Sequence, residues 1–387
     1  MHVCFYLTDS HWSGRARAFA DAARALDGRG VQCTIVCAHG ELAAALRACG
    51  HEVVAFRPAS GVLRSAWHLS ALLRSRDIDV VFVHQEREQL VAALAVRTAG
   101  RGAVIRRVPA MRAVHGSRGS WLVERLVHAG HLFAFDDDLR SAAPGRTQLE
   151  PVLAPPAIDG AAAWSGSATP ASGAVATATG EPALSPAGGI AAAASALRHV
   201  PPCRIAVLAG EEPNARVYPV LRAVALVAAQ HVSVTVQVTG VALDADALRI
   251  HAAALHIGDR TRVAAAADAP AAVSRVLATA DVAWVVAESD DAAYGMLDAM
   301  AAGVALVAER HSISQRLLPL ESAGSFAPSG GPAALAAHLL ALATNAERRA
   351  ELARAGRAAA RRWPIGAMAD GFLRAATAAR DHAQRRR

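Results

Sequence analysis

Residues 280–309 read ADVAWVVAESDDAAYGMLDAMAAGVALVAE, and this stretch decides the fold prediction. The apolar run at 282–287 predicts a strand, an acidic loop follows, residues 292–302 have a helical pattern, and 304–308 form a second apolar run. Gly303 stands where helices commonly end. Two continuous apolar strands joined by a helix are typical of a right-handed βαβ unit in a buried parallel sheet.

The same alternation of strands and helices extends in both directions from this stretch. The strands expected in the first part of the chain are 3–7, 31–37, 51–56, 80–83, 103–108 and 132–135. The strands expected in the second part are 204–208, 232–238, 261–264, 282–287, 304–308 and 325–327. Two such series predict an α/β protein with two Rossmann-like, doubly wound parallel-sheet domains that face a cleft.

A change of composition separates the two series. Between Asp159 and Arg198 the sequence consists mainly of Ala, Gly, Ser, Thr and Pro, and Glu181 is the only charged residue. Such composition predicts a linker or a disordered insertion over 159–202. We therefore expect an N-terminal domain at 1–158 and a C-terminal domain at 203–364.

The chain contains no lysine, so all 40 residues counted as Lys or Arg are arginines. This excludes a Walker P-loop and a pyridoxal-phosphate Schiff base, both of which need a lysine. Any anion must be held by arginines, backbone N–H groups or helix N-termini. The net charge of +7 favours an acidic partner, but the arginines are scattered and not interleaved with aromatic residues, which disfavours nucleic acid.

The five cysteines are odd in number and show no CxxC spacing, which is typical of free thiols in a reducing compartment. The first seven residues begin directly with an apolar strand and show no leader pattern. We therefore expect a cytoplasmic protein. No His, Cys and Asp cluster has the spacing of metal ligands, so we expect no metal site.

Three acidic residues of the opening stretch are candidate ligand-binding groups. Asp290 and Asp291 lie in the loop, and Asp298 follows eight positions after Asp290 on the helix, where successive turns point both to one side. Paired carboxylates that face a cleft can bind sugar or ribose hydroxyls. The alternative is that Asp290 caps the helix and Asp298 is an ordinary surface charge.

This segment resembles the donor-binding motif of glycosyltransferase family 4, whose members have the GT-B fold. The family motif has two acidic residues separated by seven positions and then Ala-Met-Ala/Cys-Gly. Here Asp290 and Asp298 take the acidic positions, and Ala-Met-Ala-Ala-Gly follows at 299–303. The tail at 330–363 and the first strand, loop and helix are similar to the family as well. The resemblance covers nearly the whole chain except 159–198.

The resemblance implies an enzyme that moves a sugar from a nucleotide diphosphate-sugar to an acceptor hydroxyl, with retention and without a cofactor or an obligatory metal. It also implies that a C-terminal helix at 365–387 packs back toward the N-terminal domain. In this interpretation Asp298 holds the donor ribose, Asp290 contacts the donor sugar and Arg216 neutralises the diphosphate. The remaining donor-side candidates are Gly210, Asp291 and Gly303.

On the acceptor side the resemblance points to the loop after the first strand and to two histidines. The loop residues are His11, Trp12, Ser13 and Gly14. His84, at the end of its strand, matches a histidine that the family often has there. His115 is the nearest substitute for a second family histidine, because Arg106, Arg107 and Val108 occupy the expected stretch. For His84, a hydrogen-bonded structural role is the alternative.

Several positions depart from the family pattern. Both acidic positions usually carry Glu, and here they carry Asp. Gly210 is followed by Glu211 and Glu212, where the family has an arginine that holds the diphosphate, and a carboxylate repels that anion. These departures leave two alternatives open: a catalytically inactive GT-B subunit that binds or assembles, and a sugar-nucleotide epimerase of the same fold.

A helix with Trp67 and flanking Arg64 and Arg74 is the last candidate for function. Its pattern is that of an interfacial helix or of an amphipathic helix packed on a core. Family members use basic surfaces to dock on anionic lipid, so the resemblance implies peripheral contact with the inner face of the membrane.

Overall fold

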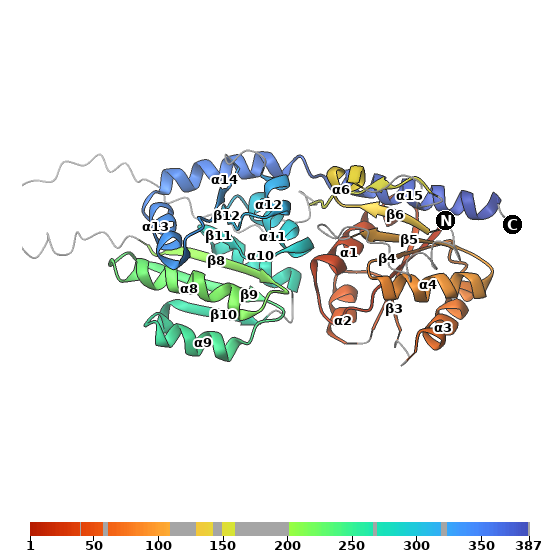
Figure 1. Ribbon diagram of the computed structural model, residues 1–387, viewed down its shortest axis with the longest axis horizontal. Coiled ribbons are helices and arrows are strands. Elements are labelled where there is room, and N and C mark those ends of the chain that lie inside the picture. Colours follow the sequence, from red (N-terminus) through yellow and green to blue (C-terminus); the bar gives the residue numbers. More distant parts are fainter. Residues whose placement is uncertain are drawn as a thin grey trace, which may run out of the picture.

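The computed structural model describes residues 1–38, 40–56, 61–108, 129–141, 149–158, 201–265, 269–318 and 323–385. These residues form two parallel β-sheets with their helices (Figure 1). The predicted linker lies outside the described residues except for Pro201 and Pro202. The prediction of two Rossmann-like parallel-sheet domains is confirmed.

Domain 1 is the first sheet with its helices. Its strands are β1 (His2–Tyr6), β2 (Gln32–Cys37), β3 (Val53–Ala55), β4 (Val80–Val83), β5 (Ala103–Val108), β6 (Ala129–Phe133) and β7 (Val152–Leu153). Their order is β3-β2-β1-β4-β5-β6-β7, and all neighbours are parallel. The helices are α1 (Gly14–Asp27), α2 (Glu41–Ala48), α3 (Val62–Ser75), α4 (Glu86–Ala99) and α6 (Asp136–Ser141). The order reverses between β1 and β4, and ligands of open α/β sheets bind at such a switch point.

Domain 2 is the second sheet with its helices. Its strands are β8 (Cys203–Gly210), β9 (Val234–Gly240), β10 (Thr261–Ala265), β11 (Val282–Val285), β12 (Ala305–Ala308) and β13 (Ser325–Phe326). Their order is β10-β9-β8-β11-β12-β13, again with parallel neighbours. The helices are α8 (Asn214–Ala228), α9 (Ala245–Ala254), α10 (Ala269–Thr279), α11 (Ser289–Ala302), α12 (Ser312–Leu317), α13 (Gly331–Thr344) and α14 (Ala346–Ala360), with a 3-10 turn η1 (Gly258–Arg260).

The βαβ unit that the opening stretch predicts is β11, α11 and β12. Both strands are buried along their whole length, which explains why they are continuous apolar runs. Gly303 ends α11 with a φ of 66°, a left-handed conformation that glycine adopts without steric cost. The unit directs the N-terminus of α11 toward domain 1 (Figure 1).

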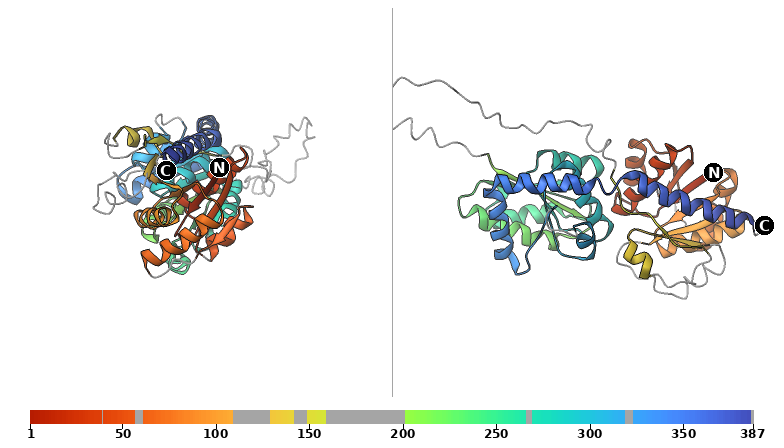
Figure 2. Two further views of the ribbon diagram at one scale, coloured as in Figure 1. Left: turned by 90° about the vertical axis from the view of Figure 1, so that its right-hand side faces the viewer. Right: turned by 90° about the horizontal axis from the view of Figure 1, so that it is seen from above.

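The last helix, α15 (Ile365–Arg385), belongs to the core of domain 1 although it follows domain 2 in sequence. Its Phe372 is fully buried, with its ring centroid 5.0 Å from that of Phe82 on β4. Figure 2 shows α14 along domain 2 and α15 along domain 1, as two blue helices in series. Where the chain crosses, the N–H of Ile158 donates to the carbonyl oxygen of Trp363 at 2.9 Å. The segment around Ile158, where the chain leaves domain 1, therefore lies beside the segment around Trp363, where it returns to domain 1.

Some elements differ from the sequence prediction. Strand β6 begins at Ala129 rather than at residue 132, and β7 and α12 were not expected. β7 has two residues and α12 has six, which is too short for a periodic pattern to emerge. None of the described helices combines the length and the apolarity that a membrane crossing requires.

Candidate functional site

The loop after β1 and the start of α1 bring the two domains into direct contact. The Ser13 hydroxyl accepts from the N–H of Ala16 at 3.3 Å and so caps α1. The N–H of Gly14 donates to Asp291 Oδ1 of domain 2 at 2.5 Å. A Cβ atom at Gly14 would lie 2.5 Å from the carbonyl carbon of Asp290, so this close approach requires glycine.

A pocket of about 600 Å³, counting the solvent at its mouth, lies between the carboxyl ends of the two sheets. It gathers six of the residues that the sequence singled out: Trp12, Ser13, Gly14, Gly210, Asp291 and Asp298. The other lining residues are Arg17, Leu208, Thr239, Gly240, Val241, Val273, Ala287, Tyr294 and Gly295. The predicted acceptor loop and donor-side residues therefore share one pocket.

Asp290 is held by an arginine of domain 1. Arg107 on β5 donates to both of its carboxylate oxygens, at 2.7 Å to Oδ2 and 3.2 Å to Oδ1. The side chains are 1% and 3% exposed, so the pair is almost free of water. Burial acts to raise the pKa of Asp290, but the Arg107 guanidinium outweighs it and holds the pKa below its usual range. Asp290 is not among the residues that line the pocket, and its carboxylate is engaged by Arg107 rather than free for a sugar.

Asp298 is held in the same way by another arginine of domain 1. Arg17 on α1 contacts it with both terminal nitrogens, with Nη2 2.8 Å from Oδ1 and Nη1 next to Oδ2. The guanidinium also lies over the Tyr294 ring, 4.7 Å from its centroid, and its Nε donates to Asp21 at 3.3 Å. Burial would lower the pKa of Arg17, but the carboxylates of Asp298 and Asp21 keep it above the ordinary value.

Glu211, the carboxylate that the sequence places where the diphosphate cation is expected, has partners on domain 1. Arg15 Nη2 lies 3.3 Å from its Oε1, and His11 Nε2 lies 3.2 Å from the same oxygen. Arg15 also contacts Asp9 at 3.1 Å. The predicted loop residue His11 is thus turned toward domain 2.

Asp291 and Asp298 are the acidic residues that line the pocket, and of these two Asp291 has no arginine partner among the hydrogen bonds and ion pairs of the described residues. Its Oδ1 accepts from Gly14, and its Cβ packs against Gly210, where an added Cβ would lie 2.6 Å away and the φ is 57°. Burial, and next the Glu211 carboxylate, raise the pKa of Asp291 to about 7, while the Gly14 N–H and Arg15 act in the opposite direction. The group therefore exchanges a proton near neutral pH.

The structure places Arg216 differently from the role that the sequence suggested. Its Nη2 contacts the carboxylate of Glu288 and lies 3.1 Å from Glu309 Oε2, and Arg216 does not line the pocket. Because Arg216 is close to Gly210 in sequence, it was expected to neutralise the diphosphate. Instead, Glu288 after β11 and Glu309 after β12 hold its side chain.

Gly303 also lies apart from the pocket. It ends α11, whereas Asp291 of the pocket lies in the first turn of the same helix. Its φ of 66° and the Arg357 guanidinium above it explain why glycine stands there. Gly303 terminates the helix rather than lining the pocket.

His84 is buried beneath α1. Its Nε2 lies 2.9 Å from the carbonyl oxygen of Arg15, and its ring stacks on Phe19 with centroids 3.8 Å apart. Burial, with Arg107 next, lowers the pKa of His84 to about 3, so the ring is neutral at physiological pH. It supports α1 and does not line the pocket. His115, the other predicted histidine, lies outside the described residues.

Sequence reasoning missed Arg17 and Arg107 as site residues. A signal existed for Arg107, because it lies in an apolar strand of a parallel sheet, where a buried charge needs a partner. Arg17 lies one turn beyond the cap of α1, on the side where ligands approach helix N-termini. Within the described ranges, no three His, Cys, Asp or Glu side chains gather as a metal site would need.

Two family models match the chain. Residues 12–139 match the model described as Glycosyltransferase Family 4, and residues 205–359 match the model described as Glycosyl transferases group 1. No curated protein sequence matches the chain.

Several solved structures share the fold over nearly the whole chain. A glycosyltransferase from Rickettsia africae is 10% identical, with a TM-score of 0.69 and 97% of both chains covered. Anabaena HepE in complex with UDP-glucose is 14% identical, with a TM-score of 0.68 and coverage of 97% of this chain and 98% of HepE. A putative UDP-N-acetylglucosamine 2-epimerase from Listeria monocytogenes is 12% identical, with a TM-score of 0.62 and coverage of 96% and 94%.

Removing Arg107 tests the buried ion pair. Arg107→Met leaves Asp290 buried without a partner and should lower the free energy of unfolding by about 3–5 kcal/mol, measured by urea denaturation. The double variant Arg107→Met/Asp290→Leu should recover most of that loss. As a control, Arg204→Met breaks a pair with Asp281 whose side chains are 52% and 27% exposed, and should lower it by less than about 1 kcal/mol. Equal losses from the two single variants would contradict the assignment.

Asp291 should make stability depend on pH. Its pKa is raised to about 7, and an exposed aspartate titrates near about 3.9, so this contribution to stability is full below pH ~4 and is lost as the pH rises to ~7. Glu211, Asp290 and Arg15 are the charged groups that face it. Asp291→Asn should flatten the dependence of Tm on pH between 5 and 7, whereas Asp246→Asn, at an exposed position, should not. The same pH slope in wild type and Asp291→Asn would refute this.

Proposed function

The chain is a family 4-like glycosyltransferase of GT-B fold, and we propose that it transfers a sugar from a nucleotide diphosphate-sugar to an acceptor hydroxyl, with retention. The observation that carries the proposal is the pocket between the two sheets, which joins Gly14 of domain 1 to Asp291 and Asp298 of domain 2. Such a pocket combines carboxylates for hydroxyl groups with the N-terminus of α1 for an anion. The UDP-glucose bound to the similar protein HepE supports this class of donor.

In the proposed reaction Asp298 accepts hydrogen bonds from the donor ribose and Asp290 from the donor sugar. Each carboxylate must first leave its arginine, Arg17 or Arg107, at least in part. The acceptor oxygen then forms a bond to the anomeric carbon while the bond from that carbon to the phosphate oxygen breaks. The acceptor proton leaves with the nucleoside diphosphate. The loop at 11–14 is the proposed acceptor side.

The second candidate function is a catalytically silent binding subunit. One observation favours it: both motif carboxylates are paired with arginines of the same chain. The epimerase alternative has support only from the fold shared with the Listeria protein, and a shared fold does not establish an activity.

Donor binding and turnover separate these possibilities. Wild type should bind UDP or GDP in a calorimetric titration. When an acceptor is supplied together with the UDP-sugar or GDP-sugar, the protein should produce free UDP or GDP. Asp298→Ala should weaken binding of the nucleoside, uridine or guanosine, about tenfold or more, because a hydrogen bond from the ribose to a charged group is lost. The matched control is Asp246→Ala, an exposed aspartate of α9.

Nucleotide binding without turnover of any sugar conjugate would favour the silent subunit. Conversion of a UDP-sugar to its epimer without transfer would favour the epimerase. A wild-type protein that binds no nucleotide at millimolar concentration would reject the donor assignment.

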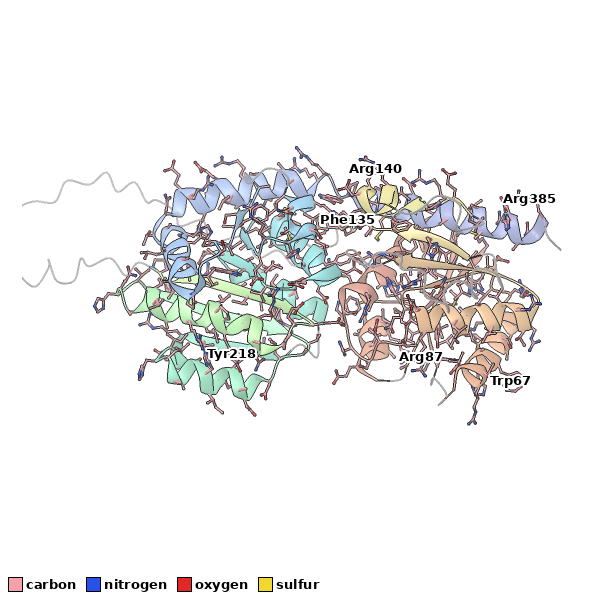
Figure 3. The ribbon with its side chains drawn as sticks, viewed as in Figure 1. Trp67, Arg87, Phe135, Arg140, Tyr218 and Arg385 are labelled. Carbon is pink, nitrogen blue, oxygen red and sulfur yellow. The ribbon has the colours of Figure 1, made fainter. Side chains whose placement is uncertain are left out.

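Helix α3 is the proposed membrane contact. Trp67 and Leu63 are 61% and 77% exposed on adjacent turns of one face, and Figure 3 places Trp67 at the end of domain 1 away from domain 2. Arg64 and Arg74 flank this face, and the ion pairs between described residues include neither of them. Aromatic and aliphatic side chains with free arginines beside them suit an anionic lipid surface.

Vesicle binding tests the membrane contact. Wild type should sediment with anionic vesicles of phosphatidylglycerol and phosphatidylcholine, and raising the salt from 50 to 500 mM should release it. Trp67→Ser should weaken binding, while Leu226→Ser, at an exposed apolar position of domain 2, should not. Equal binding to neutral and anionic vesicles, or none to either, would rule out the contact.

A further inference from the structure

A nucleotide diphosphate brings a concentrated negative charge into the pocket, and the site needs a cation for it. Domain 2 offers Gly210 followed by Glu211 and Glu212 at the end of β8, and Arg216 is held by carboxylates away from the pocket. Among the described residues that line the pocket, Arg17 is the only cation. It comes from domain 1.

Arg17 has the geometry that a phosphate requires. Its two terminal nitrogens hold Asp298 as a parallel fork, and phosphate oxygens accept from a guanidinium in the same bidentate way. The ring of Tyr294 and the carboxylate of Asp21 fix the guanidinium from two other sides. Arg17 also lies in the first turn of α1, where the positive end of the helix adds attraction for an anion.

A nucleotide diphosphate can satisfy both members of the pair at once, because it carries ribose hydroxyls and an anionic diphosphate. We propose that Arg17 is the residue that neutralises the donor diphosphate, and that Asp298 occupies its guanidinium while the pocket is empty. On donor binding, ribose hydroxyls replace the guanidinium on Asp298, and diphosphate oxygens replace the carboxylate on Arg17. This inference rests on the proposed donor class and replaces Arg216 with a residue of the opposite domain.

Three ligands test the contact of the ribose with Asp298 and the contact of the diphosphate with Arg17 separately. Calorimetric titrations use inorganic pyrophosphate, uridine and UDP, with guanosine and GDP if wild type prefers guanine. Arg17→Ala should weaken UDP and pyrophosphate about tenfold or more, and it should not weaken uridine, because it frees the Asp298 carboxylate for the ribose hydroxyls. Arg17→Lys keeps the charge without the fork and should give an intermediate loss for UDP. Arg24→Ala, on the same helix with a side chain 46% exposed, is the matched control and should bind as wild type.

Asp298→Asn should change the affinities for pyrophosphate and for uridine in opposite directions. Because it frees the Arg17 guanidinium, it should tighten pyrophosphate binding severalfold, and because it removes a hydroxyl acceptor, it should weaken uridine. This variant keeps the volume of Asp298, so folding is less at risk than in Arg17→Ala.

The inference is overturned if Arg17→Ala weakens uridine and UDP equally, since Arg17 would then act only by orienting Asp298. It is also overturned if Arg216→Ala rather than Arg17→Ala selectively weakens UDP and pyrophosphate. If wild type binds nucleotide and Arg17→Ala changes nothing, this inference fails and the proposed function stands. If wild type binds neither nucleotide nor pyrophosphate, both fail together.

Discussion

The buried ion pair between Arg107 and Asp290 is the interaction on which the arrangement of the two domains depends. Removing two ions from water costs several kcal/mol each, and only a close, two-pronged contact offsets this. Arg107 comes from a strand of domain 1 and Asp290 from the first turn of a helix in domain 2, so the contact exists only when the domains meet. The backbone of Gly14 then touches the backbone of Asp290, and the Gly14 N–H reaches Asp291.

Three ion pairs around this contact share one sense, whereas the pair between Arg316 of domain 2 and Asp138 of domain 1 has the opposite sense. Domain 2 contributes the carboxylates of Glu211, Asp290 and Asp298, and domain 1 contributes the guanidinium groups of Arg15, Arg107 and Arg17. Each of these three carboxylates is therefore paired with an arginine of the other domain. A donor must replace some of these contacts, so its net affinity is the difference between new and old interactions. The Glu211 that argues against a diphosphate in the sequence is already neutralised across the interface.

The architecture could be predicted from sequence because its signals are local. Continuous apolar runs such as 282–287 and 304–308 indicate buried parallel strands, and the structure has β11 and β12 there. The acidic helix start at Asp290 and Asp291 was also identified, because it follows a strand end that faces the cleft, whereas the loop around Gly14 was identified from the resemblance to the family. Short elements such as α12 have no such signal.

The partners of the candidate site residues could not be predicted, because they are set by contacts between the domains. Arg107 and Asp290 are 183 positions apart, and Arg17 and Asp298 are 281 apart. Nearness in sequence pointed instead to Arg216, which neighbouring carboxylates hold. His84 was a reasonable candidate at a strand end, but its ring stacks beneath α1.

Paired charges hold the two domains together. Small-angle X-ray scattering measures this directly through the radius of gyration of the free protein. Wild type should be compact, and the double variant Asp290→Asn/Asp298→Asn, which weakens both pairs without removing volume, should have a larger radius of gyration while its circular dichroism stays unchanged. Identical scattering curves for the two proteins would contradict the claim.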